Sequence, residues 1–228
     1  MTSIGIDITP QISVVLCTYN RAHYLTNAID SLLDQSFKDW ELLIVDDGSQ
    51  DNTFAIVNQY LEGHGHIRYC KHKNKGLGYA KNIGIQASLG RYLTFLDSDD
   101  TYRPNHLSSR LEYMLVNPDI DLIQGGFYSA EEIQVVDYYR PDRLIGLSKC
   151  VLGPTFFGKR RVFFELQGFK PSAYGEDTEF WERAEQKFKT HKLTEPKTYI
   201  YTRAESSITK DLASPLLSAS SADRSRSQ

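Results

Sequence analysis

Short runs of apolar, often β-branched residues alternate along the N-terminal half with segments in which apolar residues recur every three or four positions. The apolar runs predict strands at residues 12–17, 40–45, 67–70 and 92–96. The periodic segments predict helices between them, the first carrying Leu25, Ala28, Ile29, Leu32 and Leu33 on one face. This alternation is typical of the α/β class, with an open, mainly parallel sheet flanked by helices.

The pattern of apolar positions changes beyond Ile120. Strand-like runs at 122–128 and 133–139 precede a loop-rich, aromatic section that ends near Pro171. A helix is then predicted at 176–189 and a last strand at 197–201. We therefore expect one domain over residues 1–205, with one half at 11–117 and a smaller lobe at 118–205, and a polar, serine-rich and flexible tail at 206–228.

Composition narrows the class of protein. The 228 residues are 40% hydrophobic and carry a net charge of -3, which gives no global attraction to nucleic acid. The basic run at 71–75 lacks interleaved aromatic residues, so we interpret it as a solvated loop. Three widely spaced cysteines indicate a reduced, cytoplasmic protein, and no apolar run approaches the ~20 residues of a membrane span.

Polar loops follow three of the predicted strands. They are Thr18-Tyr-Asn-Arg21, Asp46-Asp-Gly-Ser49 and Asp97-Ser-Asp-Asp100. Ligands of open α/β sheets bind at the carboxyl ends of the strands, where such loops lie. Two acidic loops on one edge repel each other, and a divalent cation or hydrogen-bond donors of a ligand between them would offset that repulsion.

Asp97 and Asp99 stand two residues apart on an extended segment, with Asp100 adjacent. This arrangement suits Mg²⁺ or Mn²⁺, which commonly take one or two carboxylates and complete their shell with phosphate and water. Two structural alternatives stay open. Residues 97–100 could cap the helix that begins near Pro104, and residues 46–49 could form only a tight turn.

Four segments in order, Cys17–Arg21, Ile44–Ser49, Asn74–Gly84 and Phe95–Asp100, resemble the family 2 glycosyltransferases of GT-A fold. The resemblance covers roughly residues 11–203. It implies a metal-dependent, inverting, hexosyltransferase-like enzyme that moves a sugar from a nucleotide-diphosphate sugar, with uridine as the expected base, to an acceptor hydroxyl in glycan or polysaccharide assembly. The acceptor would be a saccharide or a lipid-linked molecule, the latter met by peripheral contact with a membrane.

The resemblance also assigns residues. It makes 11–117 the half that binds the nucleotide-sugar and 118–205 the acceptor half. Asp99 would ligate Mn²⁺ or Mg²⁺ directly, with Asp97 between the metal and the ribose. Asp47 would accept a hydrogen bond from the base edge. Lys81 would line the same pocket, and the alternative for Lys81 is a solvated charge on a helix. The remaining residues expected at the nucleotide are Cys17, Thr18, Tyr19 (against the base), Asn20, Lys81 and Asn82.

A catalytic base is expected within Gly175–Arg183, which contains four acids. Asp177 lies three and four residues before Phe180 and Trp181, on the helix face that packs inward, whereas Glu179 and Glu182 point elsewhere. The resemblance likewise makes Asp177 the base, with Glu176 and Trp181 on the acceptor side. The structural alternative is that the first-turn acids only complement the helix dipole.

Further segments also carry expectations. Glycine and aromatic residues at 125–128 and 153–158 suit sugar stacking or the core. Ala204 stands where many family members have a histidine, which leaves a third metal ligand unassigned, and Arg203 is expected at the diphosphate. Two other functions compete with the transferase. A nucleotide-sugar pyrophosphorylase would have a glycine-rich loop after the first strand, which Thr18–Arg21 lacks, and a non-catalytic nucleotide-sugar-binding module would lack Asp177.

Overall fold

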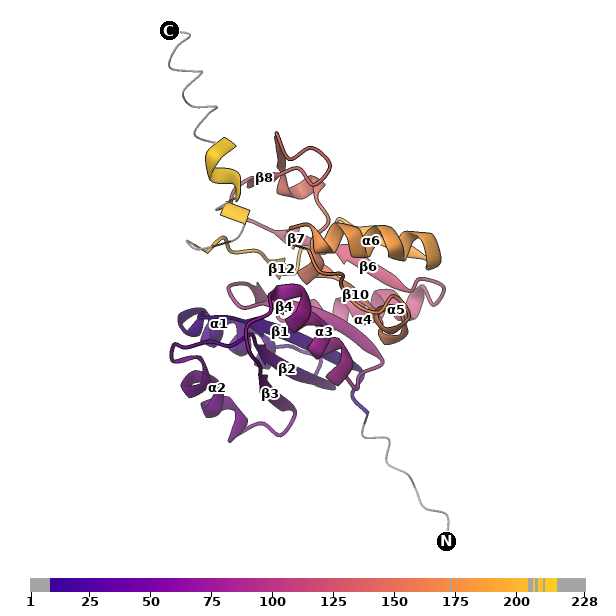
Figure 1. Cartoon of the computed structure of the whole chain (residues 1–228). Coiled ribbons are helices and arrows are strands. Elements are labelled where there is room, and N and C mark those ends of the chain that lie inside the picture. Colours follow the sequence, from indigo (N-terminus) through magenta and orange to yellow (C-terminus); the bar gives the residue numbers. More distant parts are fainter. Residues whose placement is uncertain (1–8, 173, 205–206, 208, 211, 217–228) are drawn as a thin grey trace.

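The structure is a computed structural model that describes residues 9–172, 174–204, 207, 209–210 and 212–216. Its centre is a seven-stranded sheet in the order β11-β6-β10-β4-β1-β2-β3 (Figure 1). The strands β1 (Ile12–Thr18), β2 (Trp40–Asp46), β3 (Ile67–Lys71) and β4 (Tyr92–Asp97) are parallel neighbours, as predicted. β6 (Leu122–Gly125) and β11 (Thr190–Leu193) are also parallel, and β10 (Phe157–Lys159) runs antiparallel between β4 and β6. The mainly parallel α/β sheet is confirmed.

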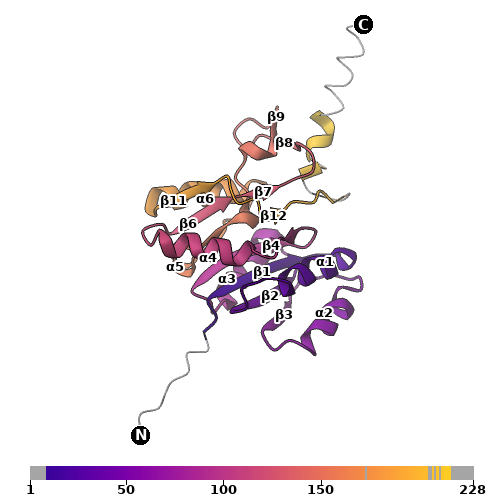
Figure 2. The same cartoon turned by 180° about the vertical axis from the view of Figure 1, so that it is seen from behind.

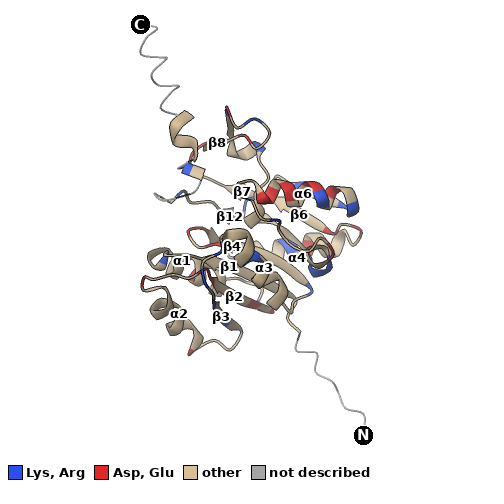
Figure 3. Ribbon diagram, in the orientation of Figure 1, with Lys and Arg blue, Asp and Glu red and all other residues tan. Residues whose placement is uncertain are grey.

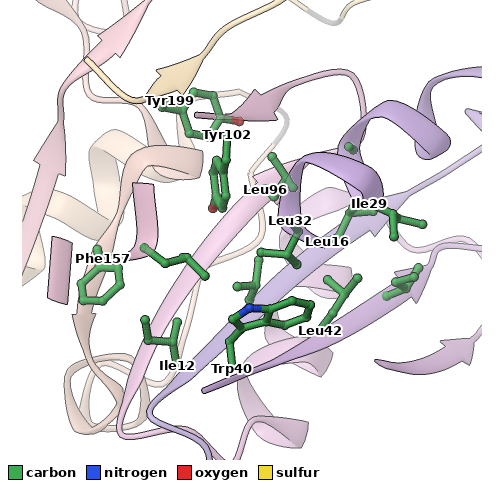
Figure 4. Close-up of a cluster of buried hydrophobic side chains, with 14 of the residues drawn as sticks. Ile12, Leu16, Ile29, Leu32, Trp40, Leu42, Leu96, Tyr102, Phe157 and Tyr199 are labelled. Carbon is green, nitrogen blue, oxygen red and sulfur yellow. The ribbon is translucent and has the colours of Figure 1, made fainter. Parts of the chain in front are cut away.

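Helices cover both faces of this sheet (Figures 1 and 2). The helices α1 (Ala22–Leu33), α2 (Thr53–Leu61) and α4 (His106–Val116) share one core cluster with alternate residues of β1. The helices α3 (Leu77–Ala87), α5 (Arg160–Glu165) and α6 (Glu176–Lys187) share the other. Figure 4 shows the first cluster, in which Ile12 and Leu16 lie near Trp40 and Leu42. Successive strand residues face opposite sides of the sheet, and helices cover both sides, so β1 is buried along its whole length.

The lobe after α4 differs from its predicted strands. Gly125 (φ 96°) and Gly126 (φ 64°) break the run expected at 122–128, because both adopt the left-handed region that glycine tolerates. The chain thus leaves β6 and enters β7 (Phe127–Tyr128) of a three-stranded sheet with β5 (Thr101–Tyr102) and β12 (Tyr199–Ile200). Of residues 133–139 only β8 (Gln134–Val136) is a strand, paired with β9 (Leu144–Gly146). Two short 3₁₀ turns, η1 (Leu147–Lys149) and η2 (Gly153–Thr155), follow.

The last described residues depart in part from the tail predicted at 206–228. Residues 209–210 and 212–216 are helical, and Ala213 is buried. A short apolar segment, Leu212-Ala-Ser-Pro-Leu216, accounts for this order within an otherwise polar stretch. The rest of the predicted tail lies outside the described residues. No helix in the described ranges has the length and apolar character needed to cross a membrane.

Candidate active site

The three polar loops predicted at strand ends meet at one edge of the sheet. Thr18, Asp46 and Asp97 are the last residues of β1, β2 and β4. In the strand register Thr18 pairs with Asp46, and Cys17 pairs with Asp97. These loops are therefore side by side on three adjacent strands, at the carboxyl edge where α/β sheets bind ligands.

The β1–α1 loop is locked to the β2–α2 loop. The amide of Asn20 donates to Ser49 Oγ at 2.8 Å, and Asn20 Oδ1 accepts from the amide of Gln50 at 2.8 Å. Asn20 has φ 52°, a left-handed conformation that asparagine tolerates better than most residues. Of the loop residues assigned to a nucleotide, Cys17 and Thr18 are buried, whereas Tyr19 is 46% exposed.

Asp46 and Asp47 are both buried, and each holds a neighbouring loop. Asp46 accepts from the amide of Ser49 at 2.7 Å and from Tyr69 Oη at 2.6 Å. Asp47 accepts from the amides of Lys75 at 2.7 Å and Gly76 at 2.8 Å. The tight-turn alternative thus describes Asp46. Asp47, expected to accept from a base edge, fixes the loop that leads into α3 in this structure.

Asp97 and Asp99 bring two carboxylates together at the end of β4. Burial raises the pKa of Asp97 to about 6; the charge of Lys81 opposes this rise and that of Asp99 adds to it. Burial likewise raises the pKa of Asp99, against the opposing charge of Arg21, whose Nη1 lies 3.5 Å from Asp99 Oδ2. Burial therefore disfavours the ionised form of both acids, and a bound cation would stabilise that form.

Asp100 has a separate task. Its carboxylate accepts from Tyr199 Oη at 2.5 Å and from the amide of Thr202 at 2.6 Å. The helix-capping alternative for residues 97–100 is wrong, because α4 begins at His106 and its N-cap residue is Asn105. Asp100 instead attaches the segment after β12 to the acidic loop. The amide of Ala204 also hydrogen-bonds Asp99, so this position contributes its backbone where the resemblance raised a histidine ligand.

Glu176 and Asp177 lie in the first turn of α6 and point at a buried lysine. Lys81 Nζ, on α3, is 3.1 Å from Glu176 Oε1 and 3.6 Å from Asp177 Oδ1. The amide of Gly153 donates to Asp177 Oδ2 at 2.8 Å. Figure 3 shows the acidic residues gathered on α6. Specific contacts thus hold Asp177 in place, which a role as a mere dipole partner would not require.

The two acids of this pair titrate differently. Burial raises the pKa of Asp177 to about 7, with the charge of Glu176 adding to the rise and that of Lys81 opposing it. For Glu176 burial raises the pKa, but the charge of Lys81 together with hydrogen bonds from Asp177 and Lys81 outweighs burial, and the pKa is lowered. The distances agree with this order, since Lys81 lies closer to Glu176. Of the two acids, Asp177 is therefore the one that binds a proton, and it changes charge near neutral pH.

Lys81 and its neighbour Asn82 face different surroundings. Lys81 is 2% exposed, so the alternative of a solvated helix charge is wrong. Burial lowers its pKa, but the carboxylates of Asp177, Glu176 and Asp97 outweigh burial and raise it overall. Asn82 binds the backbone of Phe169 at both ends of its amide, at 2.8 Å each. The structure thus brings Lys81 to the acids and commits Asn82 to the loop after α5.

Trp181, expected on the acceptor side, and Arg203, expected at the diphosphate, both make contacts within the protein. Trp181 is 6% exposed, packs on Phe156 with ring centroids 5.7 Å apart and donates to Glu185 at 2.7 Å, so it belongs to the core. Arg203 donates to the carbonyl of Thr209 at 3.3 Å. The sequence predicts no individual role for Arg21 or Tyr199, and it places Gly153 only within a segment suited to sugar stacking or the core. Arg21 carries a signal as part of a polar loop at a strand end.

The protein donors available to a metal are few. The described residues contain no cluster of three or more His, Cys, Asp or Glu side chains placed to hold a metal ion. Asp97 and Asp99 therefore fit a cation that takes the rest of its ligands from a bound phosphate and water, as Mg²⁺ and Mn²⁺ commonly do. They do not fit a cation held by protein side chains alone.

A sequence model of the family described as Glycosyl transferase family 2 matches residues 13–170. Glycosyltransferase GlyG of Streptococcus pneumoniae is 34% identical over 122 residues, which are 53% of this chain and 40% of that protein. The chain spans less than half the length of the curated relatives it matches. The match includes all three loops at the sheet edge but ends before α6.

Solved structures share the fold. S. aureus TarS 1-349 in complex with UDP-GlcNAc matches with a TM-score of 0.73 and 21% identity, over 88% of this chain and 60% of that chain. Mannosyltransferase PcManGT from Pyrobaculum calidifontis, in complex with GDP-Man and Mn²⁺, matches with a TM-score of 0.68 and 18% identity, over 86% and 58%. These matches confirm the GT-A type of fold predicted from the sequence.

Proposed function

This chain belongs to glycosyl transferase family 2, and from that premise we propose that it is an inverting, metal-dependent transferase. It would move a sugar from a nucleoside-diphosphate sugar, with UDP as the expected carrier, to an acceptor hydroxyl. The single observation that carries this proposal is Asp177, a carboxyl held by Gly153 and Lys81, with a pKa raised to about 7. A general base works best when its pKa lies near the operating pH.

The donor would lie along the sheet edge. The exposed ring of Tyr19 supports a stacked base, and the hydrogen bonds between the β1–α1 and β2–α2 loops would hold this part of the site in place. Asp97 and Asp99 would hold Mn²⁺ or Mg²⁺ together with the diphosphate oxygens. The cation, when bound, would neutralise negative charge on the departing nucleoside diphosphate. Lys81, whose pKa is raised by the carboxylates of Asp177, Glu176 and Asp97, adds a positive charge near these acids.

Transfer would proceed in one displacement. Asp177 accepts the proton of the acceptor hydroxyl as that oxygen bonds to the anomeric carbon, and the bond from this carbon to the diphosphate oxygen breaks. Attack opposite the leaving group inverts the anomeric configuration. Glu176 keeps its charge through Lys81, which leaves Asp177 as the carboxyl of the pair that takes and releases a proton.

The TarS and PcManGT structures support a nucleotide-sugar donor without fixing the base, since one complex contains UDP-GlcNAc and the other GDP-Man. Glycan or polysaccharide assembly, with a saccharide or lipid-linked acceptor, is our proposed setting. The presence of Asp177 weighs against a binding module without catalysis. The loop after β1, which has no glycine, weighs against a pyrophosphorylase.

The test combines two substitutions with measurements of both binding and transfer. Asp177→Asn should retain Mn²⁺-dependent UDP binding by calorimetry and lose transfer from radiolabelled nucleotide-sugars by about 10³-fold, a typical effect of removing a base. Asp99→Ala should weaken both binding and transfer. Normal transfer by Asp177→Asn would refute the base assignment, and a product of retained anomeric configuration by NMR would refute the single displacement.

A further inference from the structure

Arg21 forms an ion pair with the acid assigned to the metal. Its Nη1 lies 3.5 Å from Asp99 Oδ2, and the two side chains are only 18% and 16% exposed. The guanidinium also lies over the ring of Tyr24, 5.5 Å from the centroid. Burial raises the pKa of Asp97 and of Asp99, and the charge of Arg21 opposes both rises. The arginine therefore offsets part of the negative charge of the acidic loop.

No other lysine or arginine of the described ranges forms an ion pair with Asp99. Lys81, the buried cation nearby, is committed to Glu176 and Asp177. Arg21 thus stands where an arriving divalent cation would have to compete with it for the Asp99 carboxylate. Two cations that share one carboxylate repel each other, most strongly where solvent is partly excluded.

The backbone on either side of Arg21 is fixed. The amide of Asn20 donates to Ser49 Oγ at 2.8 Å, and the amide of Ala22 donates to Asp51 Oδ2 at 3.0 Å. The main chain that carries Arg21 is thus anchored, and a change of partner by the guanidinium would be a change of side-chain rotamer. A diphosphate would give it a new partner, because guanidinium groups bind phosphate oxygens in a bidentate manner.

We propose that Arg21 couples the binding of the divalent cation to the binding of the nucleoside diphosphate. In the free protein Arg21 occupies Asp99 and weakens cation binding. When a diphosphate binds, Arg21 pairs with it and leaves Asp99 to the cation. The coupling is reciprocal, so the cation also strengthens diphosphate binding. This inference rests on the proposed function, since it requires the metal and the diphosphate at this edge.

The experiment measures Mn²⁺ binding by the EPR signal of free Mn²⁺, with and without UDP, for the whole chain. Without UDP, Arg21→Gln should bind Mn²⁺ about five- to tenfold more tightly than wild type, the range expected for loss of one partly buried charge. The factor by which UDP tightens Mn²⁺ binding should fall by a similar amount. Arg21→Lys keeps the positive charge beside Asp99, so its affinity for Mn²⁺ without UDP should stay within about twofold of wild type. Circular dichroism spectra establish that each variant is folded.

The outcomes separate the two proposals. The coupling role would be overturned if Arg21→Gln bound Mn²⁺ no more tightly than wild type without UDP. It would also be overturned if Arg21→Lys bound Mn²⁺ as tightly as Arg21→Gln. Either result would leave the metal assignment intact. Asp99→Asn serves as the reference, since it should lose Mn²⁺ binding in every condition. If Asp99→Asn binds Mn²⁺ like wild type, the metal assignment in the proposed function fails instead.

Discussion

A β-carbon on Gly153 would lie 2.7 Å from the carboxyl carbon of Asp177. The same residue donates its amide to that carboxylate at 2.8 Å. Position 153 thus both binds the proposed base and leaves no space for any side chain beside it. The Asp177 carboxylate is placed by two elements far apart in the sequence, η2 and the first turn of α6.

Gly153→Ala should therefore displace Asp177 without removing it. We expect kcat to fall by about 10- to 100-fold, because displacements of about 1 Å in a reacting group have effects of this size. Mn²⁺-dependent UDP binding should be unchanged. Gly63→Ala is the matched control, since a β-carbon there meets nothing within 4 Å. Wild-type kcat in Gly153→Ala would show that Asp177 is not positioned by this contact.

The pH profile should report the same carboxyl. Asp177 must be ionised to accept a proton, and its pKa is raised to about 7 by burial. kcat/KM should therefore rise as pH increases through about 7 and then level off. Initial-rate assays between pH 5.5 and 9 would measure how kcat/KM depends on pH. A profile that is flat across this range would argue against a base with a raised pKa.

Lys81→Met should shift this profile. Without the lysine charge, Glu176 and Asp177 lose the interaction that lowers the pKa of each acid. The rise in kcat/KM should therefore move to higher pH, by about one unit or more for a charge this close. Partial recovery of activity at pH 9 would distinguish this effect from misfolding. Loss of activity by the same factor at all pH values would contradict it.

Replacing the proposed base should stabilise the fold in alkaline solution. The folded pKa of Asp177 is raised above its unfolded value, so ionisation costs folding free energy as pH rises through about 7. Asp177→Asn removes this cost while Lys81 keeps Glu176 at 3.1 Å. We expect a melting temperature higher by about 2–6 °C at pH 8.5 and by less at pH 5.5. The same difference in melting temperature between Asp177→Asn and wild type at both pH values would contradict this expectation.

Tyr199→Phe tests the attachment of the last sheet segment. The Tyr199 hydroxyl donates to Asp100 in a fully buried setting, and its loss leaves a buried carboxylate short of a donor. We expect the free energy of unfolding in urea to fall by about 1–3 kcal/mol. Tyr139→Phe is the control, because its hydroxyl bonds Glu182 at the surface at 2.6 Å. Equal effects of the two changes would mean that the buried contact carries no special weight.

The sequence predicted the first four strands because each is an apolar run bounded by polar loops, a pattern local to a few residues. β10 and β11 escaped prediction. Phe157-Gly-Lys159 and Thr190-His-Lys-Leu193 are short and lack both alternation and a continuous apolar run. Their strand conformation comes from pairing with β4 and β6 and not from local preference.

The candidate site was predictable in the same measure. That three loops share one edge follows from parallel strands alone. The partner of Asp100 was not predictable, because Tyr199 lies 99 residues away along the chain. Nor was the difference between Lys81 and Asn82, since only the packing of α3 against α6 and the loop at Phe169 decides which side chain meets the acids.

The contacts of Asp100 also bear on the order in which this protein folds. Tyr199 and Thr202 reach Asp100 across 99 and 102 residues. Forming such contacts requires closing a long loop, so they should come late in folding, after the local β–α units. During that interval the acids at the end of β4 remain hydrated and movable. The ability to bind a donor would therefore be acquired in the final folding step, when β12 joins its sheet.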